Sequence, residues 1–356
     1  MDPIALGVCG LGRIGVDHCR WFSRNREQYR LTALCDVDPQ RLNHLALEYG
    51  AREYNDLDAL TADPEVELVI VATRSLDHVR HARRALEARK IVLLEKPIAV
   101  TEKDFRDLTQ LEAAYPGKLY FGHNHRFEPA FTQMRAMIDS GALGRVYGIK
   151  LSRHRPFERR NDWQTRLDCG GGQLSVWGPH LIDQGLQLLG APVRDVWSRL
   201  QRILTPGDGD DHVNIVLTGE NGVVVEVEIS NCVALPCPYA VVYGDRGILK
   251  CDQEQKHIHI KHLDPQFRWP DAVAHAETPA PGHGFNDDPE LPWIEKTVKV
   301  EPEGNMWEIV EIELAKRLYD AIRRGVPFPV KNAEALEVVR ITEMVKRRNP
   351  QFAWLQ

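Results

Sequence analysis

The 356-residue sequence has no apolar run that approaches the roughly 18 residues needed for a membrane-spanning helix. It has no excess of basic residues either, because 45 Lys and Arg stand against 51 Asp and Glu. We therefore expect no binding to nucleic acid or to an anionic membrane. Internal repeats and low-complexity tracts are absent. A hydrophobic content of 43% with 27% charged residues excludes disordered, collagenous and coiled-coil chains.

Paired cysteines are absent as well. The seven cysteines are odd in number and scattered, and no two pairs have the spacing of a zinc site. Reduced thiols in a cytoplasmic protein without a metal site are the expectation. The apolar N-terminal stretch has no basic segment and is interrupted by four glycines, so we do not expect a signal peptide. His257, His259 and His262 resemble a metal cluster, but their alternation favours an exposed strand.

A chain of this length exceeds the roughly 250–300 residues of a single hydrophobic core, which predicts two domains. Up to residue 123, short apolar runs alternate with helical segments, and this rhythm predicts a doubly wound parallel sheet. The expected strands are 4–9, 31–35, 66–72, 91–94 and 119–122. Thr101 and Asp104 resemble a capping box at the start of the last helix of this half.

From residue 124 to residue 356 the pattern predicts an α+β domain with an open, mostly antiparallel sheet. Asn221-Gly222 separates two β-rich runs and indicates a hairpin. A helix over 128–140 precedes the strands, and helices over 305–324 and 333–347 close the chain. The proline-rich segment 265–292 is expected to be a long surface loop. The remaining expected strands are 146–153, 193–202, 212–218, 223–230, 240–243, 248–250 and 257–262.

A glycine-rich motif, Gly10-Leu11-Gly12-Arg13-Ile14-Gly15, follows the first expected strand and opens a helix. In this context the glycines permit a tight turn, close approach of a pyrophosphate and close packing of helix on strand. Asp36 ends the next strand, where a carboxylate would bind ribose hydroxyls and repel a 2′-phosphate. No basic residue follows Asp36 directly, so the sequence predicts NAD as the cofactor.

Lys96 lies just past the expected strand 91–94, at the sheet edge where open α/β sheets bind ligands. Pro97 keeps Lys96 out of the following helix. A lysine in a partly desolvated cleft can have its pKa lowered and serve as an acid–base group.

These motifs resemble the Gfo/Idh/MocA family of NAD(P)-dependent sugar and polyol oxidoreductases. The resemblance rests on GLGRIG, Glu95-Lys96-Pro97, the run 124–129 (NHRFEP), the run 170–174 (GGGQL) and the run 178–183 (GPHLID). It implies an N-terminal Rossmann domain, a catalytic pair formed by Lys96 and His180, and no metal. The implied cofactor contacts are Gly10, Gly12, Arg13, Ile14, Gly15, Asp36, Ala72, Thr73, Arg74, His78, Glu95, Lys96, Asn124 and Trp163. The implied substrate contacts are Lys96, Arg126, Arg153, Asp162, Trp163, Trp177, His180 and Asp183.

One position departs from the family pattern. An aspartate usually stands four residues before the histidine, and here that place holds Val176. Either the proton relay rests on Lys96 and His180 alone, or another carboxylate reaches His180. Asp162 and Asp183 are the nearest candidates by sequence.

The sequence therefore predicts an NAD-dependent oxidoreductase that transfers a hydride from a secondary hydroxyl of a sugar, glycoside or polyol to nicotinamide C4. One alternative is NAD-dependent glycoside cleavage through a transient ketone, with NAD recycled. Another is an NAD-binding regulator without catalysis. The resemblance also implies a homodimer or homotetramer.

Overall fold

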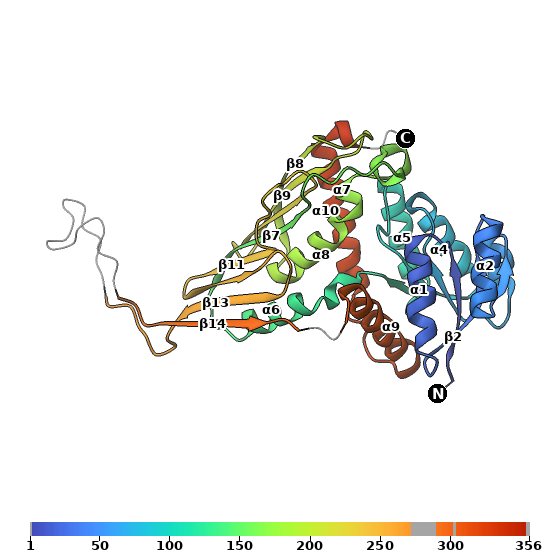
Figure 1. Cartoon of the computed structure of the whole chain (residues 1–356), viewed down its shortest axis with the longest axis horizontal. Coiled ribbons are helices and arrows are strands. Elements are labelled where there is room, and N and C mark those ends of the chain that lie inside the picture. Colours follow the sequence, from blue (N-terminus) through green and yellow to red (C-terminus); the bar gives the residue numbers. More distant parts are fainter. Residues whose placement is uncertain (1, 272–289, 302–303, 354–356) are drawn as a thin grey trace.

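The computed structural model describes residues 2–271, 290–301 and 304–353, which form two sheets with helices around and between them (Figure 1). The N-terminal sheet has six parallel strands in the order β3-β2-β1-β4-β5-β6, which confirms the doubly wound Rossmann topology. Its strands are β1 (Ile4–Cys9), β2 (Tyr29–Cys35), β3 (Arg52–Tyr54), β4 (Leu68–Val71), β5 (Ile91–Leu94) and β6 (Leu119–Phe121). Its helices are α1 (Arg13–Arg24), α2 (Pro39–Tyr49), α3 (Leu57–Ala62), α4 (His78–Glu87) and α5 (Glu102–Ala114).

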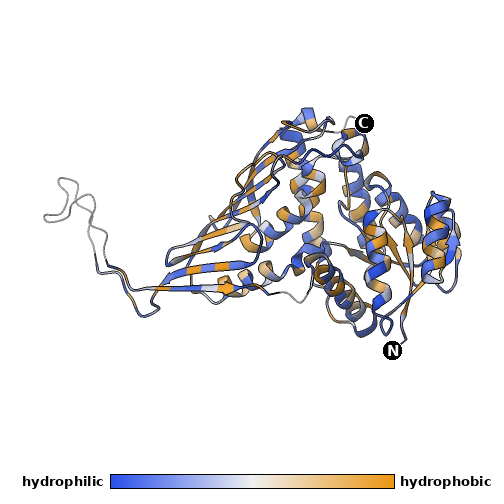
Figure 2. Cartoon of the chain, in the orientation of Figure 1, coloured by the Kyte–Doolittle hydropathy of each residue, from blue (hydrophilic) through white to orange (hydrophobic). Residues whose placement is uncertain are grey.

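Side chains of the N-terminal strands alternate between two hydrophobic cores, one on each face of the sheet. Leu68 and Ile70 pack with α1 and α2, whereas Val69 and Val71 pack with α3, α4 and α5. The helices are amphipathic, as Figure 2 shows by their apolar and polar stripes. The capping box at Thr101 is present, because the Thr101 side chain accepts the Asp104 N–H and the Asp104 side chain accepts the Thr101 N–H.

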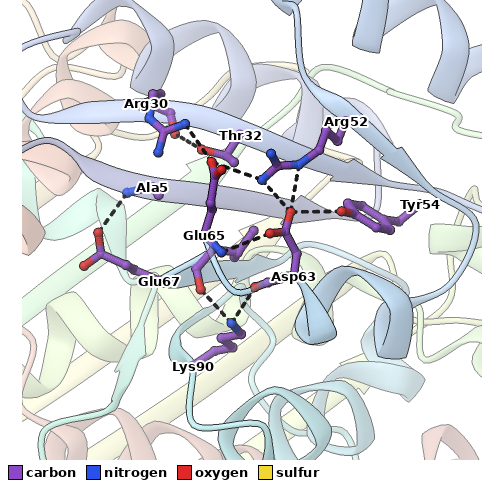
Figure 3. Close-up of polar contacts among 10 residues, drawn as sticks. Ala5, Arg30, Thr32, Arg52, Tyr54, Asp63, Glu65, Glu67 and Lys90 are labelled. Atoms are coloured by element: carbon purple, nitrogen blue, oxygen red, sulfur yellow. Dashed lines mark hydrogen bonds and ion pairs between the residues drawn. The ribbon is translucent and has the colours of Figure 1, made fainter.

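Two short elements, β3 and α3, were missing from the sequence prediction, and Figure 3 shows the polar network that holds them. Asp63 accepts hydrogen bonds from Arg52 Nε and Tyr54 Oη, both at 2.9 Å. Lys90 Nζ donates to the carbonyl oxygens of Asp63 and Val66, both at 2.8 Å. A three-residue strand has little local signal, so these contacts between distant residues position it.

The second sheet has eight strands in the order β14-β13-β12-β11-β7-β10-β9-β8, and all pairs are antiparallel except β7 with β10. This confirms the predicted open sheet and the Asn221-Gly222 hairpin, and adds β14, which the sequence did not reveal. The strands are β7 (Val146–His154), β8 (Val193–Gln201), β9 (His212–Gly219), β10 (Val224–Ser230), β11 (Ala240–Gly244), β12 (Gly247–Cys251), β13 (His257–Leu263) and β14 (Trp293–Lys299). Most of the predicted loop 265–292 lies outside the described residues.

Helices α6 (Pro129–Asp139), α8 (Gly178–Leu189) and α10 (Asn332–Arg348) cover one face of the second sheet. The two closing helices also reach the first sheet, as Figure 1 shows for α9 (Met306–Arg324) beside α1. Leu314 and Leu318 of α9 join the core under α1, and Tyr29 Oη donates to the Ala315 carbonyl at 2.6 Å. Side chains of α10 enter the cores of both halves, which fixes the two sheets relative to each other. In the part of the chain that is described, every helix is too short or too polar to cross a membrane.

Candidate active site

The glycine-rich loop joins β1 to α1. Gly10 and Gly15 stand where a side chain would collide with the backbone, whereas Gly12 borders open space. A β-carbon on Gly10, whose φ is +92°, would lie 2.6 Å from the Ala72 carbonyl oxygen. A β-carbon on Gly15 would lie 1.8 Å from the Gly10 carbonyl oxygen. A β-carbon on Gly12 would meet nothing within 4 Å, so this residue faces open space at the start of α1. No side chain caps this helix end, and the loop therefore fits the pyrophosphate of a dinucleotide.

Asp36 follows β2 and is buried beside the glycine-rich loop. Its Oδ2 accepts the Leu11 N–H at 2.6 Å and its Oδ1 accepts the Asp38 N–H at 2.8 Å. The first turn of α2 places Arg41 Nη1 3.4 Å from the same carboxylate. Sequence reasoning examined only the residues directly after Asp36 and missed this cation. Asp36 therefore shapes the loop and also has a basic neighbour.

The loops after β4 and β5 are joined by His78. Its Nδ1 lies 2.9 Å from the Pro97 carbonyl oxygen, and its Nε2 lies 3.0 Å from the Thr73 carbonyl oxygen. The ring thus holds the segment after Ala72 against the segment that carries the candidate lysine. Arg74 is exposed in the same loop.

Lys96 is partly buried at the carboxyl end of β5. Within the described ranges its ammonium group makes no hydrogen bond and no ion pair. Burial lowers the pKa of Lys96; Glu95 opposes this effect and Arg13 adds to it. An unpaired amine with a lowered pKa loses its own proton more readily, and its neutral form can accept a proton from a hydroxyl.

A buried ionic network lies next to this lysine. The His18 ring sits between two carboxylates, with Nε2 2.9 Å from Glu95 Oε1 and Nδ1 3.1 Å from Glu311 Oε2. Asn124 Nδ2 donates to the other Glu311 oxygen at 2.6 Å. Burial acts to lower the pKa of His18, but Glu311 and Glu95 outweigh it and raise the pKa to about 10. Glu95 and Asn124 were both expected at the cofactor. In the structure their side chains contact His18 of α1 and Glu311 of α9, respectively, and so connect these helices to the segments after β5 and β6.

Three buried histidines form the other side of the site: His123, His125 and His180. The ring centroids of His125 and His180 are 3.9 Å apart. Among the described residues, both nitrogens of His180 and of His123, and Nε2 of His125, have no hydrogen-bond partner. Burial, followed by the charges of His125 and Lys96, holds the pKa of His180 well below its usual range. His180 is therefore neutral at pH 7, and its chemistry is that of a hydrogen-bonding imidazole.

Arg153 and two tryptophans line the same region. The Arg153 guanidinium lies 3.4 Å from the centre of the Trp177 ring, and its Nε has no hydrogen-bond partner. Trp307 of α9 is 6.1 Å from Trp177 and 5.1 Å from His125, centre to centre. Burial lowers the pKa of Arg153 to about 10, against the opposing charge of Glu128. Sequence reasoning missed Trp307, because it lies 130 residues beyond Trp177.

Arg126 and Asp183, both expected at the substrate, form a bidentate ion pair with each other. Arg126 Nε and Nη2 donate to the Asp183 carboxylate at 2.7 and 2.5 Å. Arg126 Nη1 also donates to Glu334 Oε2 at 2.5 Å and to the Pro329 carbonyl oxygen at 2.9 Å. The pair connects the segment after β6 to α8 and α10, and neither oxygen of Asp183 is available to His180.

Asp162 and Trp163 belong to a segment of the second domain that contacts the start of α1. Asp162 is exposed and forms an ion pair with Arg160. The neighbouring Gln164 accepts a hydrogen bond from Arg13 Nη2 at 3.2 Å, which brings this segment of the second domain to the glycine-rich loop. Trp163 therefore lies close to the start of α1, where its expected contact with the cofactor remains a prediction.

The helical segment around His180 is divided in two. A turn of helix, α7 (Gln173–Val176), ends at Trp177, and α8 starts at Gly178. Pro179 has no N–H for a helical hydrogen bond, so the ladder restarts there. The glycines at 170–172 approach protein atoms, because a β-carbon on Gly171 would lie 2.5 Å from the Gln164 carbonyl oxygen.

The histidines of β13 are held by ordinary polar contacts. His257 lies 2.8 Å from Asp252, His259 lies 2.9 Å from Thr297, and His262 lies 2.9 Å from the Leu263 carbonyl oxygen. Among the described residues, no group of three possible metal ligands comes together.

Comparisons with known proteins agree with this geometry. Residues 4–123 match the model of the oxidoreductase family with an NAD-binding Rossmann fold, and residues 131–250 match the Gfo/Idh/MocA C-terminal domain. A 1-carboxy-3-chloro-3,4-dihydroxycyclohexa-1,5-diene dehydrogenase of Comamonas testosteroni is 31% identical over 63% of this chain and 57% of its own length. Inositol 2-dehydrogenase 2 of Saccharopolyspora erythraea is 32% identical over 63% of this chain and 66% of its own length.

Among solved structures, GenD2 from gentamicin A biosynthesis, in complex with NAD, superimposes with a TM-score of 0.76. It is 23% identical, and the match covers 98% of this chain and 94% of that one. At this identity the likeness concerns the fold. Together with the two family models, which follow each other along the sequence, the geometry leads to one conclusion: the chain belongs to the Gfo/Idh/MocA family of NAD-binding oxidoreductases.

Proposed function

We propose that the protein oxidises a secondary hydroxyl of a sugar, glycoside or polyol, with NAD as the hydride acceptor. The observation that supports this most is the state of Lys96, an unpaired amine with a lowered pKa at the carboxyl end of the Rossmann sheet. Lys96 is also among the groups that lower the pKa of His180, which supports placing the two residues in one site. Such a pair suits removal of a hydroxyl proton.

In the proposed reaction, neutral Lys96 Nζ takes the hydroxyl proton while the carbon of the substrate loses a hydride, leaving a ketone. NAD supplies the hydride acceptor when it is bound. His180 holds the hydroxyl by a hydrogen bond through an unpartnered ring nitrogen. The glycine-rich loop and the uncapped start of α1 bind the pyrophosphate.

A ring-shaped, hydroxylated substrate is supported by the aromatic surface of the site. Trp177 and Trp307 offer faces to the C–H face of a ring, and Arg153 offers hydrogen-bond donors beside them. The name inositol 2-dehydrogenase of one relative supports the same substrate class.

We also propose a homodimer or homotetramer formed by the uncovered face of the second sheet. Large apolar side chains are exposed on its strands, among them Tyr147 and Trp197, each 53% exposed, and Trp293 at 43%. Light scattering of the purified protein after gel filtration tests this, and a monomer at micromolar concentration would contradict it.

The function is tested by incubating the purified protein with NAD and a panel of inositols, free sugars and glycosides. NADH should accumulate with at least one of them, in proportion to the ketone formed. Cleavage of a glycoside without net NADH would instead support the recycling reaction, and NADH binding without any turnover would support a regulator. Lys96→Met should lower turnover by roughly 10²–10⁴, and Lys103→Met, at an exposed helical lysine, is the matched control.

A further inference from the structure

The absence of an acid at Val176 leaves open which group orients His180. The two carboxylates nearest in sequence do not, because Arg126 holds both oxygens of Asp183 and Asp162 is exposed beside Arg160. Neither ring nitrogen of His180 has a hydrogen-bond partner. The group that does contact the His180 ring is His125, at 3.9 Å between ring centres.

His125 is attached to a carboxylate of its own. Its Nδ1 lies 2.5 Å from Glu128 Oε1, and both side chains are at most 2% exposed. Glu128 Oε2 accepts hydrogen bonds from Gln184 Nε2 at 2.9 Å and Tyr239 Oη at 3.1 Å. Burial acts to raise the pKa of Glu128, but His125, Arg153 and Gln184 outweigh it and hold the pKa below its usual value. Glu128 is thus ionised, and both of its carboxylate oxygens have hydrogen-bonding partners.

An ionised carboxylate can only accept hydrogen bonds, so the proton of neutral His125 resides on Nδ1. Its Nε2 is then an acceptor, buried and without a partner among the described residues. The adjacent neutral His180 ring has one N–H donor and one acceptor nitrogen, and both are likewise without a partner there. A buried polar atom without a partner costs about 1–3 kcal/mol. The two rings now lie face to face, with centres 3.9 Å apart and a tilt of 49°, so an N–H···N bond between them requires the rings to move apart into edge-on contact.

We infer that Glu128, acting through His125, is the carboxylate that orients His180 in place of the acid absent at Val176. In this relay, His125 Nε2 accepts the N–H of His180, and the other nitrogen of His180 is left as an acceptor for the substrate hydroxyl. His125 and Glu128 are positioning residues, and the assignment of His180 to the hydroxyl rests on the proposed function. The charged or titratable groups that face the pair are Lys96, His123 and Arg153, with Glu128 as the negative one.

The test compares Glu128→Gln, His125→Gln and the control Tyr239→Phe, which removes one hydrogen bond to Glu128 but no charge. Glu128→Gln and His125→Gln should lower kcat by about 10–100-fold, the usual cost of losing the partner that orients a histidine. KM for NAD should stay the same. Loss of the negative charge lowers the pKa of its neighbours, so in Glu128→Gln the acidic limb of kcat against pH should move down by roughly one unit. Val176→Asp added to Glu128→Gln should move it back up.

Nitrogen-15 NMR of the histidine rings, without substrate, tests the relay independently of turnover. The spectrum should show the proton of His125 on Nδ1 in the parent protein and on Nε2 in Glu128→Gln. If no substrate turns over but this change occurs, the proposed function fails and the relay stands. An unchanged His125 tautomer, or a folded His125→Gln with kcat within threefold of the parent, overturns the relay. A Glu128→Gln variant that loses only thermal stability, with kcat and pH limb unchanged, overturns it as well.

Discussion

We predict that the buried carboxylate of Asp36 favours NAD over NADP, and Asp36→Asn isolates the effect of its charge. The substitution keeps the size of the side chain and one oxygen that can accept the Leu11 N–H, now at 2.6 Å. Asp36→Ala would instead also break the glycine-rich loop. The change in cofactor affinity therefore reports the loss of the Asp36 charge and not a change in the loop structure. A thermal unfolding curve checks that the variant is folded.

The expected size of the effect follows from the contact. A 2′-phosphate at the ribose site would meet the Asp36 carboxylate, and such a like-charge contact costs about 1–3 kcal/mol, or roughly 5–150-fold in affinity. Arg41 acts in the opposite direction, but its side chain is 45% exposed, so its attraction to a phosphate is about 0.2–1 kcal/mol. The carboxylate should dominate, and the parent should bind NADH at least about tenfold more tightly than NADPH.

Fluorescence titrations of NADH and NADPH give the ratio of the two Kd values. Asp36→Asn should bring the ratio toward one, Arg41→Leu should widen it by about twofold to fivefold, and Asp38→Asn, at the cap of α2, should leave it unchanged. Equal affinities in the parent protein, or an Asp36→Asn ratio like that of the parent, would refute this reasoning.

Three other predictions follow from the same geometry. Lys96→Met should leave NADH affinity nearly intact and lower kcat by roughly 10²–10⁴, and turnover within threefold of the parent would remove Lys96 from the mechanism. Asp183→Asn, which breaks a buried ion pair, should cost about 3–5 kcal/mol in urea unfolding, whereas exposed Asp162→Asn should cost under about 0.5 kcal/mol. A stable Asp183→Asn with a raised substrate KM would instead make Asp183 a binding residue. Because the pKa of His18 is raised to about 10, its contribution to stability is complete below its unfolded pKa of about 6.5 and is lost as the pH rises through 10. His18→Gln should remove that slope from the free energy of unfolding, and an equal slope in both proteins would contradict the buried network.

Much of this protein was readable without coordinates, because the relevant signals are local. The glycine-rich turn, the capping box at Thr101 and the Asn221-Gly222 hairpin each depend on residues within a few positions of one another. Buried strands such as Leu68–Val71 are visible as short apolar runs. Lys96 could be placed at the end of β5 for the same reason, because it lies two residues after the apolar run Ile91–Leu94.

The partners of the site residues were not readable, because they are far apart in the chain. His18 meets Glu95 across 77 positions, Arg126 meets Asp183 across 57, and Asn124 meets Glu311 across 187. These pairs form because helices α1, α8 and α9 pack against the segments after β5 and β6. The packing of helices is set by the shape of whole surfaces and not by neighbouring residues in the sequence.

The sequence consequently proposed candidate site residues but did not indicate which of them face each other. Asp183 shows this best. Its position three residues after His180 made it a candidate partner of that ring, but in the structure it forms an ion pair with the buried Arg126. Leaving the Arg126 charge unpaired in the interior would cost more free energy than a hydrogen bond between Asp183 and a neutral ring could supply.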